Sequence, residues 1–175
     1  MTASAGHRGF AGVGVPRLSE VLELLAPSQL RVNIELKNSV VDYPGLEELV
    51  LEAVAEAGLP GERVVLSSFS VESVRQLARL TEMEVAWVYG RPQLRPLAHA
   101  LALGVRAIHP SRRGLTGGLV NRAHGKQVAV RPWVVNHPGR LRRMFALGVD
   151  AVFTDVPALA RAIRAEVDAA ARPRG

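Results

Sequence analysis

Short runs of β-forming residues alternate with helical segments along most of the chain. We expect six strands, each rich in branched apolar residues and bounded by turn residues, at 32–37, 63–67, 84–89, 106–109, 127–132 and 150–154. Apolar residues between them recur at helical spacing, and glycines mark several helix ends. A helix is also expected before the first strand, at 18–25, and after the last, at 157–171. This alternation predicts an α/β fold with parallel strands joined by crossover helices, either a barrel or a doubly wound sheet.

One junction between a helix and a strand occurs twice. Residues 102–108 read ALGVRAI and residues 146–152 read ALGVDAV, so five of the seven positions are identical. We therefore expect the same backbone path, from helix end through glycine to strand, at both places.

The first expected strand has one polar and one apolar face. In 32–37 (VNIELK) every second residue is apolar, so Glu35 and Lys37 share the polar face. Their side chains leave the backbone roughly 6.5–7 Å apart, because a strand rises about 3.3 Å per residue. Both faces of a doubly wound sheet are covered by helices, whereas the inner face of a barrel can carry polar catalytic groups near the carboxyl ends of the strands. Two interpretations remain open, an inward-facing polar surface and a solvated edge strand.

A closed barrel of this type has eight strands, and the pattern predicts six. Six parallel strands leave two unpaired edges, at the strands of Val32 and Asp150. The sequence therefore predicts an open sheet or an incomplete TIM-type barrel, with about six of eight strand-helix units.

The composition favours one globular domain over residues 1–175, with residues 1–14 resembling a linker and 172–175 a tail. The absence of cysteine excludes disulfides, thiolate metal sites and cysteine nucleophiles. No run of 18 apolar residues and no signal-peptide pattern occurs, so we expect no membrane span and, for the chain as written, a cytoplasmic location. The net charge of +6 comes mainly from scattered arginines, and only 5% of residues are aromatic, so we expect a solvated basic surface and no nucleic-acid partner.

Six short motifs follow one another in a fixed order. They are VPRLSEVL at 15–22, NIELK at 33–37, YPG at 43–45, SSF at 67–69, PWVVN at 132–136 and TDVP at 154–157. In this order and spacing they resemble the glycerophosphodiester phosphodiesterases, whose motifs read I-P-T-L-x-E-V-L, I-E-I-K, Y-P-G, S-S-F, W-T-V-N and T-D-x-P. The resemblance covers nearly the whole chain from about Gly12 onward.

This resemblance implies a TIM-type barrel that hydrolyses a small-molecule glycerophosphodiester to an alcohol and glycerol 3-phosphate, with Ca²⁺ or Mg²⁺ as cofactor. By the same resemblance, Glu35 is a metal ligand and Lys37 faces the phosphate. Carboxylates suit such hard cations, and an ammonium group stabilises charge developing on phosphoryl oxygens. Phe69 and Trp133 correspond to residues that line the substrate pocket, although Phe69 fits a plain core aromatic as well.

The four histidines beyond the N-terminal segment show no metal-ligand spacing. His109 ends an expected strand, where it could contact the substrate, but a satisfied loop histidine is the simpler interpretation. His99 and His124 are expected on helices, and His137 at the start of one.

The chain also departs from the family pattern. The family begins with His-Arg-Gly, Glu-x-Asp and His-Asp motifs, which supply the acid-base histidines and two further metal ligands. Here His7-Arg8-Gly9 stands too close to Val15 for an intervening strand, and we interpret it as a chance match. Glu166-Val167-Asp168 falls on the last expected helix, and no His-Asp pair occurs.

We therefore expect a truncated phosphodiesterase with impaired catalysis and a weakly bound cation. A non-catalytic remnant that binds phosphoesters, or self-associates through its exposed sheet edges, is the alternative. A different phosphate-handling barrel is a third possibility.

Overall fold

A computed structural model describes residues 12 and 14–171 of the chain. Within these ranges five strands form one parallel sheet in the order β1-β2-β3-β4-β5. Their bounds are β1 Val32–Leu36, β2 Val64–Ser68, β3 Glu84–Tyr89, β4 Ala107–Pro110 and β5 Ala129–Val130. The expected N-terminal linker up to residue 14, apart from Gly12 and Gly14, the tail at 172–175 and the chance match at His7-Arg8-Gly9 lie outside the described residues.

Helices connect the strands in chain order. They are α1 Leu18–Leu25, α2 Leu46–Glu56, α3 Val71–Leu80, α4 Pro96–Ala102, α5 Gly117–His124, α6 Pro138–Ala146 and α7 Pro157–Ala171, with a short 3₁₀ helix, η1, at Gly61–Arg63. The predicted bounds of the first and last helices are confirmed. None of the described helices is long and apolar enough to cross a membrane.

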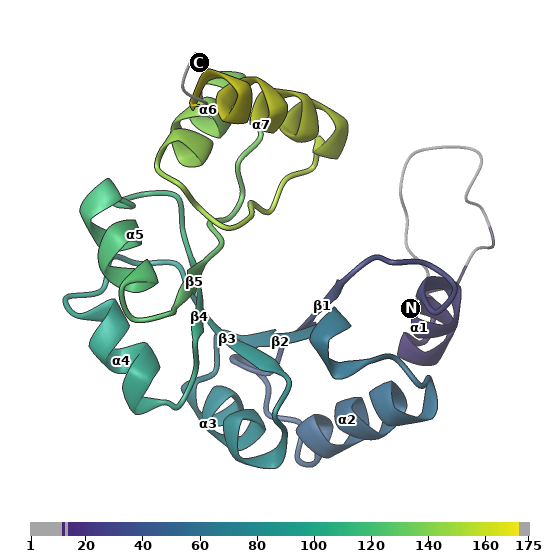
Figure 1. The fold of residues 1–175 in the computed structure, drawn as a ribbon. Coiled ribbons are helices and arrows are strands. Elements are labelled where there is room, and N and C mark those ends of the chain that lie inside the picture. Colours follow the sequence, from purple (N-terminus) through teal and green to yellow (C-terminus); the bar gives the residue numbers. More distant parts are fainter. Residues whose placement is uncertain (1–11, 13, 172–175) are drawn as a thin grey trace.

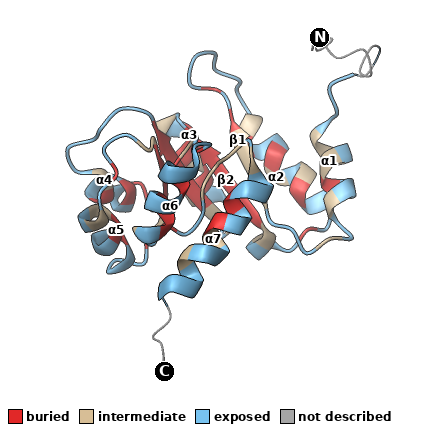
Figure 2. Cartoon of the chain, turned by 90° about the horizontal axis from the view of Figure 1, so that it is seen from above, coloured by how far each residue is buried: buried red, intermediate tan, exposed pale blue. Residues whose placement is uncertain are grey.

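The sheet curves into an open arc with helices around its outer side (Figure 1). The register shows how its two faces differ. Leu66, which pairs with Ile34 and Val85, belongs to the large core that the helices cover, and buried residues concentrate in the strands and on the helix sides that face them (Figure 2). On the opposite face, Val65, Ala86 and Ala107 form a separate small cluster. A single helical layer excludes the doubly wound sheet, so the fold is an incomplete TIM-type barrel.

The expected sixth strand, 150–154, is not formed as a strand. The segment still follows β5, because Asp150 N–H donates to Val130 O over 3.1 Å and Phe153 N–H to Pro132 O over 3.0 Å. On that side of β5, however, two backbone N–H groups that would donate to a sixth strand are not available. Val130 N–H donates to the Asp150 carboxylate instead, and Pro132 has no N–H.

The fifth strand is also shorter than predicted, since only Ala129 and Val130 of 127–132 are in strand pairing. Gln127 adopts a left-handed backbone with φ of 55°, which prevents an earlier strand start. By contrast, the helix-to-glycine part of the duplicated junction is confirmed, because Gly104 and Gly148 have φ of 79° and 78° after helices α4 and α6, although a strand follows only the first of them.

Candidate active site at the carboxyl ends of the strands

The polar face of β1 lies on the concave side of the sheet. Asn33 shares this face, and its amide Nδ2 donates to Ser67 Oγ over 3.0 Å. Ser67 in turn pairs with Ala86, a member of the small inner cluster. Since residues alternate along a strand, Glu35 also projects to this side. Both interpretations that the sequence left open therefore hold in part. The polar face points to the concave side, and β1 is also an edge strand, because β2 is its single neighbour in the described sheet.

Lys37 and Glu35 form an ion pair at the end of β1, with 3.4 Å between Lys37 Nζ and Glu35 Oε1. The Lys37 side chain is 81% exposed and that of Glu35 is 29% exposed. An ion pair exposed to water is weak. The Lys37 ammonium is therefore accessible to an anionic ligand at this end of the sheet.

A buried polar cluster anchors the chain immediately after these two residues. Asn38 Nδ2 donates to Glu47 Oε1 over 3.1 Å and to Ser73 Oγ, which ties β1 to helices α2 and α3. Ser68 Oγ at the end of β2 donates to Leu36 O over 2.8 Å. These contacts hold the carboxyl ends of β1 and β2 in place. Sequence reasoning missed Asn38, although a polar residue following a strand in this way is a recognisable signal.

The two aromatic residues predicted for the pocket come together. The Phe69 and Trp133 rings meet edge to face with 5.5 Å between their centroids. Trp133 Nε1–H donates to His109 O over 2.9 Å, and a side chain at Gly90 would lie 3.6 Å from the indole. Phe69 is 37% exposed, so its interpretation as a plain core aromatic is wrong.

His109 is buried within β4 and is 1% exposed. Its ring packs edge-on against Phe153, and its Nε2 lies 3.4 Å from Arg131 Nη1. Nδ1 makes no hydrogen bond within the described part of the chain. Burial, together with the positive charge of Arg131, lowers the pKa of His109 to about 3. The interpretation as a satisfied loop histidine is therefore wrong, since the residue is a neutral histidine with one unpaired buried nitrogen.

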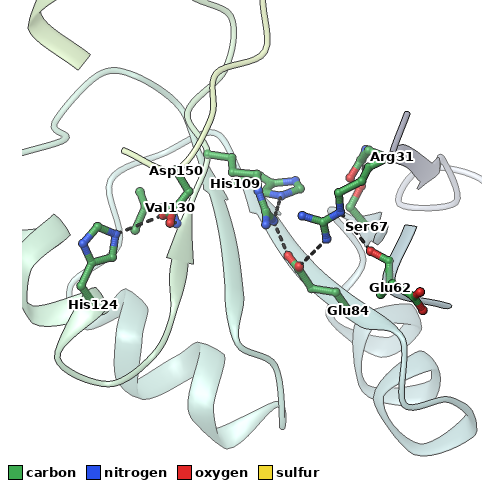
Figure 3. Close-up of polar contacts among 10 residues, drawn as sticks. Arg31, Glu62, Ser67, Glu84, His109, His124, Val130 and Asp150 are labelled. Atoms are coloured by element: carbon green, nitrogen blue, oxygen red, sulfur yellow. Dashed lines mark hydrogen bonds and ion pairs between the residues drawn. The ribbon is translucent and has the colours of Figure 1, made fainter. Parts of the chain in front are cut away.

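A charged network lies below His109 on the inner face. Figure 3 shows the Arg31 and His109 side chains directed toward Glu84, the first residue of β3. Arg31 Nη2 is 2.9 Å from Glu84 Oε2, and Arg131 pairs with the other carboxylate oxygen. Burial by itself would raise the pKa of Glu84, but hydrogen bonds and charge from Arg131 and Arg31 outweigh it and lower that pKa. Sequence reasoning missed this network, because Glu84 begins β3 whereas Arg31 lies just before β1 and Arg131 just after β5.

The remaining motif residues meet after β5. Asn136 Oδ1 accepts hydrogen bonds from Thr154 Oγ1 over 3.1 Å and from Asp155 N–H over 2.9 Å. Asn136 Nδ2 donates to Asp155 Oδ2 over 2.6 Å. The PWVVN and TDVP motifs are thus a single hydrogen-bonded unit, which fixes the loop before helix α7.

The other histidines lie as predicted, with His99 in α4, His124 at the end of α5 and His137 capping α6.

The described residues do not provide a complete site for a divalent cation. Ca²⁺ and Mg²⁺ take six or more oxygen ligands, several of them carboxylates or waters. Over residues 12 and 14–171 no group of three or more His, Asp or Glu side chains is placed to hold a metal. Glu35 offers one carboxylate, which Lys37 already contacts.

A hollow of about 680 Å³ opens at the other end of the sheet. Its lining includes Arg31, Glu62, Glu84 and Arg106, and none of the six motifs contributes to it. Ligand sites of barrels of this type lie at the carboxyl ends of the strands, so the candidate site remains the end that carries Glu35, Lys37, Phe69 and Trp133.

The fold and the site define a TIM-type barrel domain whose strand ends present a carboxylate, an ammonium and an aromatic pair. The sequence profile of the "Glycerophosphoryl diester phosphodiesterase family" matches residues 2–159. The chain belongs to this family, which confirms the resemblance.

One relative agrees with this assignment, and two solved structures share the fold. A glycerophosphodiester phosphodiesterase of Bacillus altitudinis is 36% identical over 170 residues, covering 93% of this chain and 69% of the relative. A solved glycerophosphodiester phosphodiesterase from Parabacteroides distasonis superposes with a TM-score of 0.77 at 22% identity, over 86% of this chain and 64% of that one. A phosphodiesterase from Oleispira antarctica, solved in complex with the product sn-glycerol-3-phosphate, gives 0.70 at 21% identity, over 85% and 60%. The chain therefore spans about six to seven tenths of the length of these proteins.

Proposed function

We propose that this chain carries the substrate-binding part of a glycerophosphodiester phosphodiesterase, a phosphoric diester hydrolase that releases an alcohol and glycerol 3-phosphate. The observation that carries the proposal is the Glu35–Lys37 pair on the inner face, at the strand end where such barrels bind ligands. Family membership and the product-bound relative support the substrate class.

Each residue has a distinct proposed role. Lys37 approaches the phosphoryl oxygens and stabilises the negative charge that grows on them during hydrolysis. Glu35 contributes one oxygen ligand toward Ca²⁺ or Mg²⁺. Phe69 and Trp133 flank the glycerol or alcohol part of the substrate, and their edge-to-face contact keeps both rings in place. His109 supports this pocket through its backbone carbonyl, which accepts the hydrogen bond of the Trp133 indole.

We further propose that the 175-residue polypeptide by itself hydrolyses its substrate poorly. A single carboxylate binds a divalent cation weakly, and the described residues contain no group of three or more His, Asp or Glu side chains placed to hold one. Binding of the product and turnover of the substrate should therefore separate, with binding retained and turnover low.

The test measures both properties on the purified chain. Glycerol 3-phosphate binding is followed by Trp fluorescence, and its release from glycerophosphocholine is followed with and without Ca²⁺ or Mg²⁺. We expect saturable binding that weakens at least tenfold in Lys37→Met. Lys126→Met is the matched control, because Lys126 is the second of only two lysines in the sequence and is exposed in the loop before β5.

Two results would contradict the proposal in different ways. Equal binding by the wild type and Lys37→Met would exclude the phosphate contact. Rapid, metal-dependent turnover by the isolated chain would refute impaired catalysis but leave the substrate class intact.

The alternative is a non-catalytic, self-associating domain, and the edge position of β1 favours it specifically. This strand has one neighbour within the described sheet, and an unpaired edge can pair with another chain. Sedimentation velocity over a range of concentrations tests this, because a chain that stays monomeric throughout would count against edge pairing.

A further inference from the structure

The loops that follow β3, β4 and β5 carry positive charge and no negative charge. Residues 90–95, 111–116 and 133–137, together with the first turns of α4, α5 and α6, contain no Asp or Glu. These segments, which we call the basic sector, contain Arg91, Arg95, Arg112, Arg113 and Arg140. None of these arginines forms an ion pair with another described residue. The basic sector therefore presents positive charge that its own side chains leave uncompensated.

The loops of the basic sector lie against one another. Ser111 N–H donates to Tyr89 O over 2.8 Å, which joins the second loop to the end of β3. Arg112 N–H donates to Trp133 O over 3.1 Å, and its Nη1 donates to Val134 O over 3.2 Å. The three loops thus form one surface, and this surface adjoins Trp133 of the candidate active site.

The same end of the sheet carries the two most exposed large apolar side chains among the described residues. Leu94, in the basic sector, is 97% exposed, and Val40, in the loop after β1, is 95% exposed. Because parallel strands of a barrel have their carboxyl ends on one side, these two loops lie on the same side of the domain. They belong to different parts of the open arc, in which β1 and β5 are the two ends (Figure 1). Apolar side chains therefore stand in water on the side of the domain that carries the unpaired arginines.

An anionic lipid bilayer matches both features. The negative surface potential of such a membrane attracts arginines, and an apolar side chain is stabilised when it enters the boundary between headgroups and acyl chains. Nucleic acid would match the arginines alone, because Leu94 and Val40 provide no aromatic ring on which bases stack. The combination of charge and apolar exposure thus favours lipid.

We propose that the loops at the carboxyl ends of the strands dock this domain on an anionic lipid bilayer. The arginines of the basic sector lie among the lipid headgroups, while Leu94 and Val40 enter the apolar boundary beneath them. The candidate active site then faces the membrane. Docking does not depend on the proposed hydrolysis, so the two proposals are tested separately.

Co-sedimentation with lipid vesicles tests the docking. The two preparations are phosphatidylcholine alone and phosphatidylcholine with about one-third phosphatidylglycerol, which supplies the anionic charge. We expect the chain to pellet with the anionic vesicles and to remain in solution with the neutral ones. Binding should weaken as the salt concentration rises from about 0.1 M toward 1 M, because the Debye length falls from about 10 Å to about 3 Å.

Matched variants separate the effect of charge from that of apolar contact. Arg113→Gln should weaken binding to anionic vesicles about fivefold, as expected for one basic residue near the surface. Arg79→Gln, at the end of α3 that leads into β3, should leave binding unchanged. Leu94→Ser should weaken binding several-fold, whereas Leu24→Ser, which removes a 77% exposed leucine from the last turn of α1, should not. Leu94→Ser should bind glycerol 3-phosphate as the wild type does, because Leu94 lies outside the candidate active site.

Several results would overturn the proposal. Absence of binding to anionic vesicles would do so, and glycerol 3-phosphate binding in the same sample would leave the proposed function intact. Equal binding to neutral and anionic vesicles would exclude a role for the arginines. Weakening in Arg113→Gln without any in Leu94→Ser, or release from the vesicles by single-stranded RNA, would show a general polyanion surface in place of a membrane-docking one.

Discussion

Arg131 Nη1 lies 3.4 Å from His109 Nε2, which places a permanent cation beside a buried imidazole. Burial of the ring, together with this neighbouring cation, keeps His109 neutral, and Nε2 is an acceptor toward the guanidinium in that state. The inner face therefore combines a neutral, buried histidine with an exposed lysine, Lys37.

The stability of the domain should fall as the pH is lowered from about 6.5. The pKa of His109 is about 3 in the folded protein and near 6.5 in an unfolded chain. Between these values the unfolded state binds a proton that the folded state excludes, so acid favours unfolding. The free energy of unfolding should drop by roughly 1.4 kcal/mol per pH unit from this residue.

Urea denaturation between pH 7 and 4 measures this slope, and His109→Gln supplies the comparison. The variant keeps a polar amide but cannot titrate, so its stability should depend less on pH. Identical slopes for both proteins would show that His109 is not the group responsible.

Trp133→Phe should lower the free energy of unfolding by about 1–2 kcal/mol, because it leaves the carbonyl of His109 without its donor. Phe69→Leu should cost less, since Phe69 is partly exposed and retains an apolar side chain. Equilibrium urea unfolding of both variants gives the comparison. A larger loss in Phe69→Leu would mean that ring packing, and not the hydrogen bond, dominates.

Asn38→Ala should destabilise the domain by about 2–4 kcal/mol, because it removes a donor to the buried carboxylate of Glu47 and to Ser73. Asn121→Ala, on the exposed side of α5, is the matched control and should change stability by less than about 0.5 kcal/mol. Thermal unfolding followed by circular dichroism distinguishes the two. Equal melting temperatures would show that the Asn38 contacts contribute nothing.

Gly148→Ala should cost about 1–2 kcal/mol. The residue has φ of 78°, where a Cβ atom is strained, and no neighbour lies within 4 Å of the added methyl group, so the cost comes from the backbone. Gly118→Ala within α5 should be neutral or stabilising, because alanine favours a helix and the atom nearest its methyl group is the mobile end of Arg122. Denaturation midpoints check both, and a neutral Gly148→Ala would argue against the left-handed conformation there.

Local pattern determined most of the secondary structure. Strand 84–89 and helices 18–25 and 157–171 were predicted to the residue, because apolar periodicity is a property of adjacent positions. Strand 127–132 was predicted too long and strand 150–154 was predicted where none forms. The left-handed Gln127 and the side chain of Asp150, which takes the N–H of Val130, depend on a neighbouring segment that periodicity does not reveal.

The candidate site was likewise determined partly by the sequence and partly by the tertiary structure. The sequence alone brought Glu35 and Lys37 to one face, through strand alternation. Its motifs named Phe69 and Trp133, and the end of an expected strand indicated His109. Tertiary structure decided that this face is concave, that the two aromatic rings meet, and that His109 is buried against Arg131. It also revealed the pairing of Glu84 with Arg31 and Arg131. Alternation along a strand acts over two residues, whereas these contacts join positions 22 to 64 residues apart, and only the curvature of the assembled sheet brings them within reach.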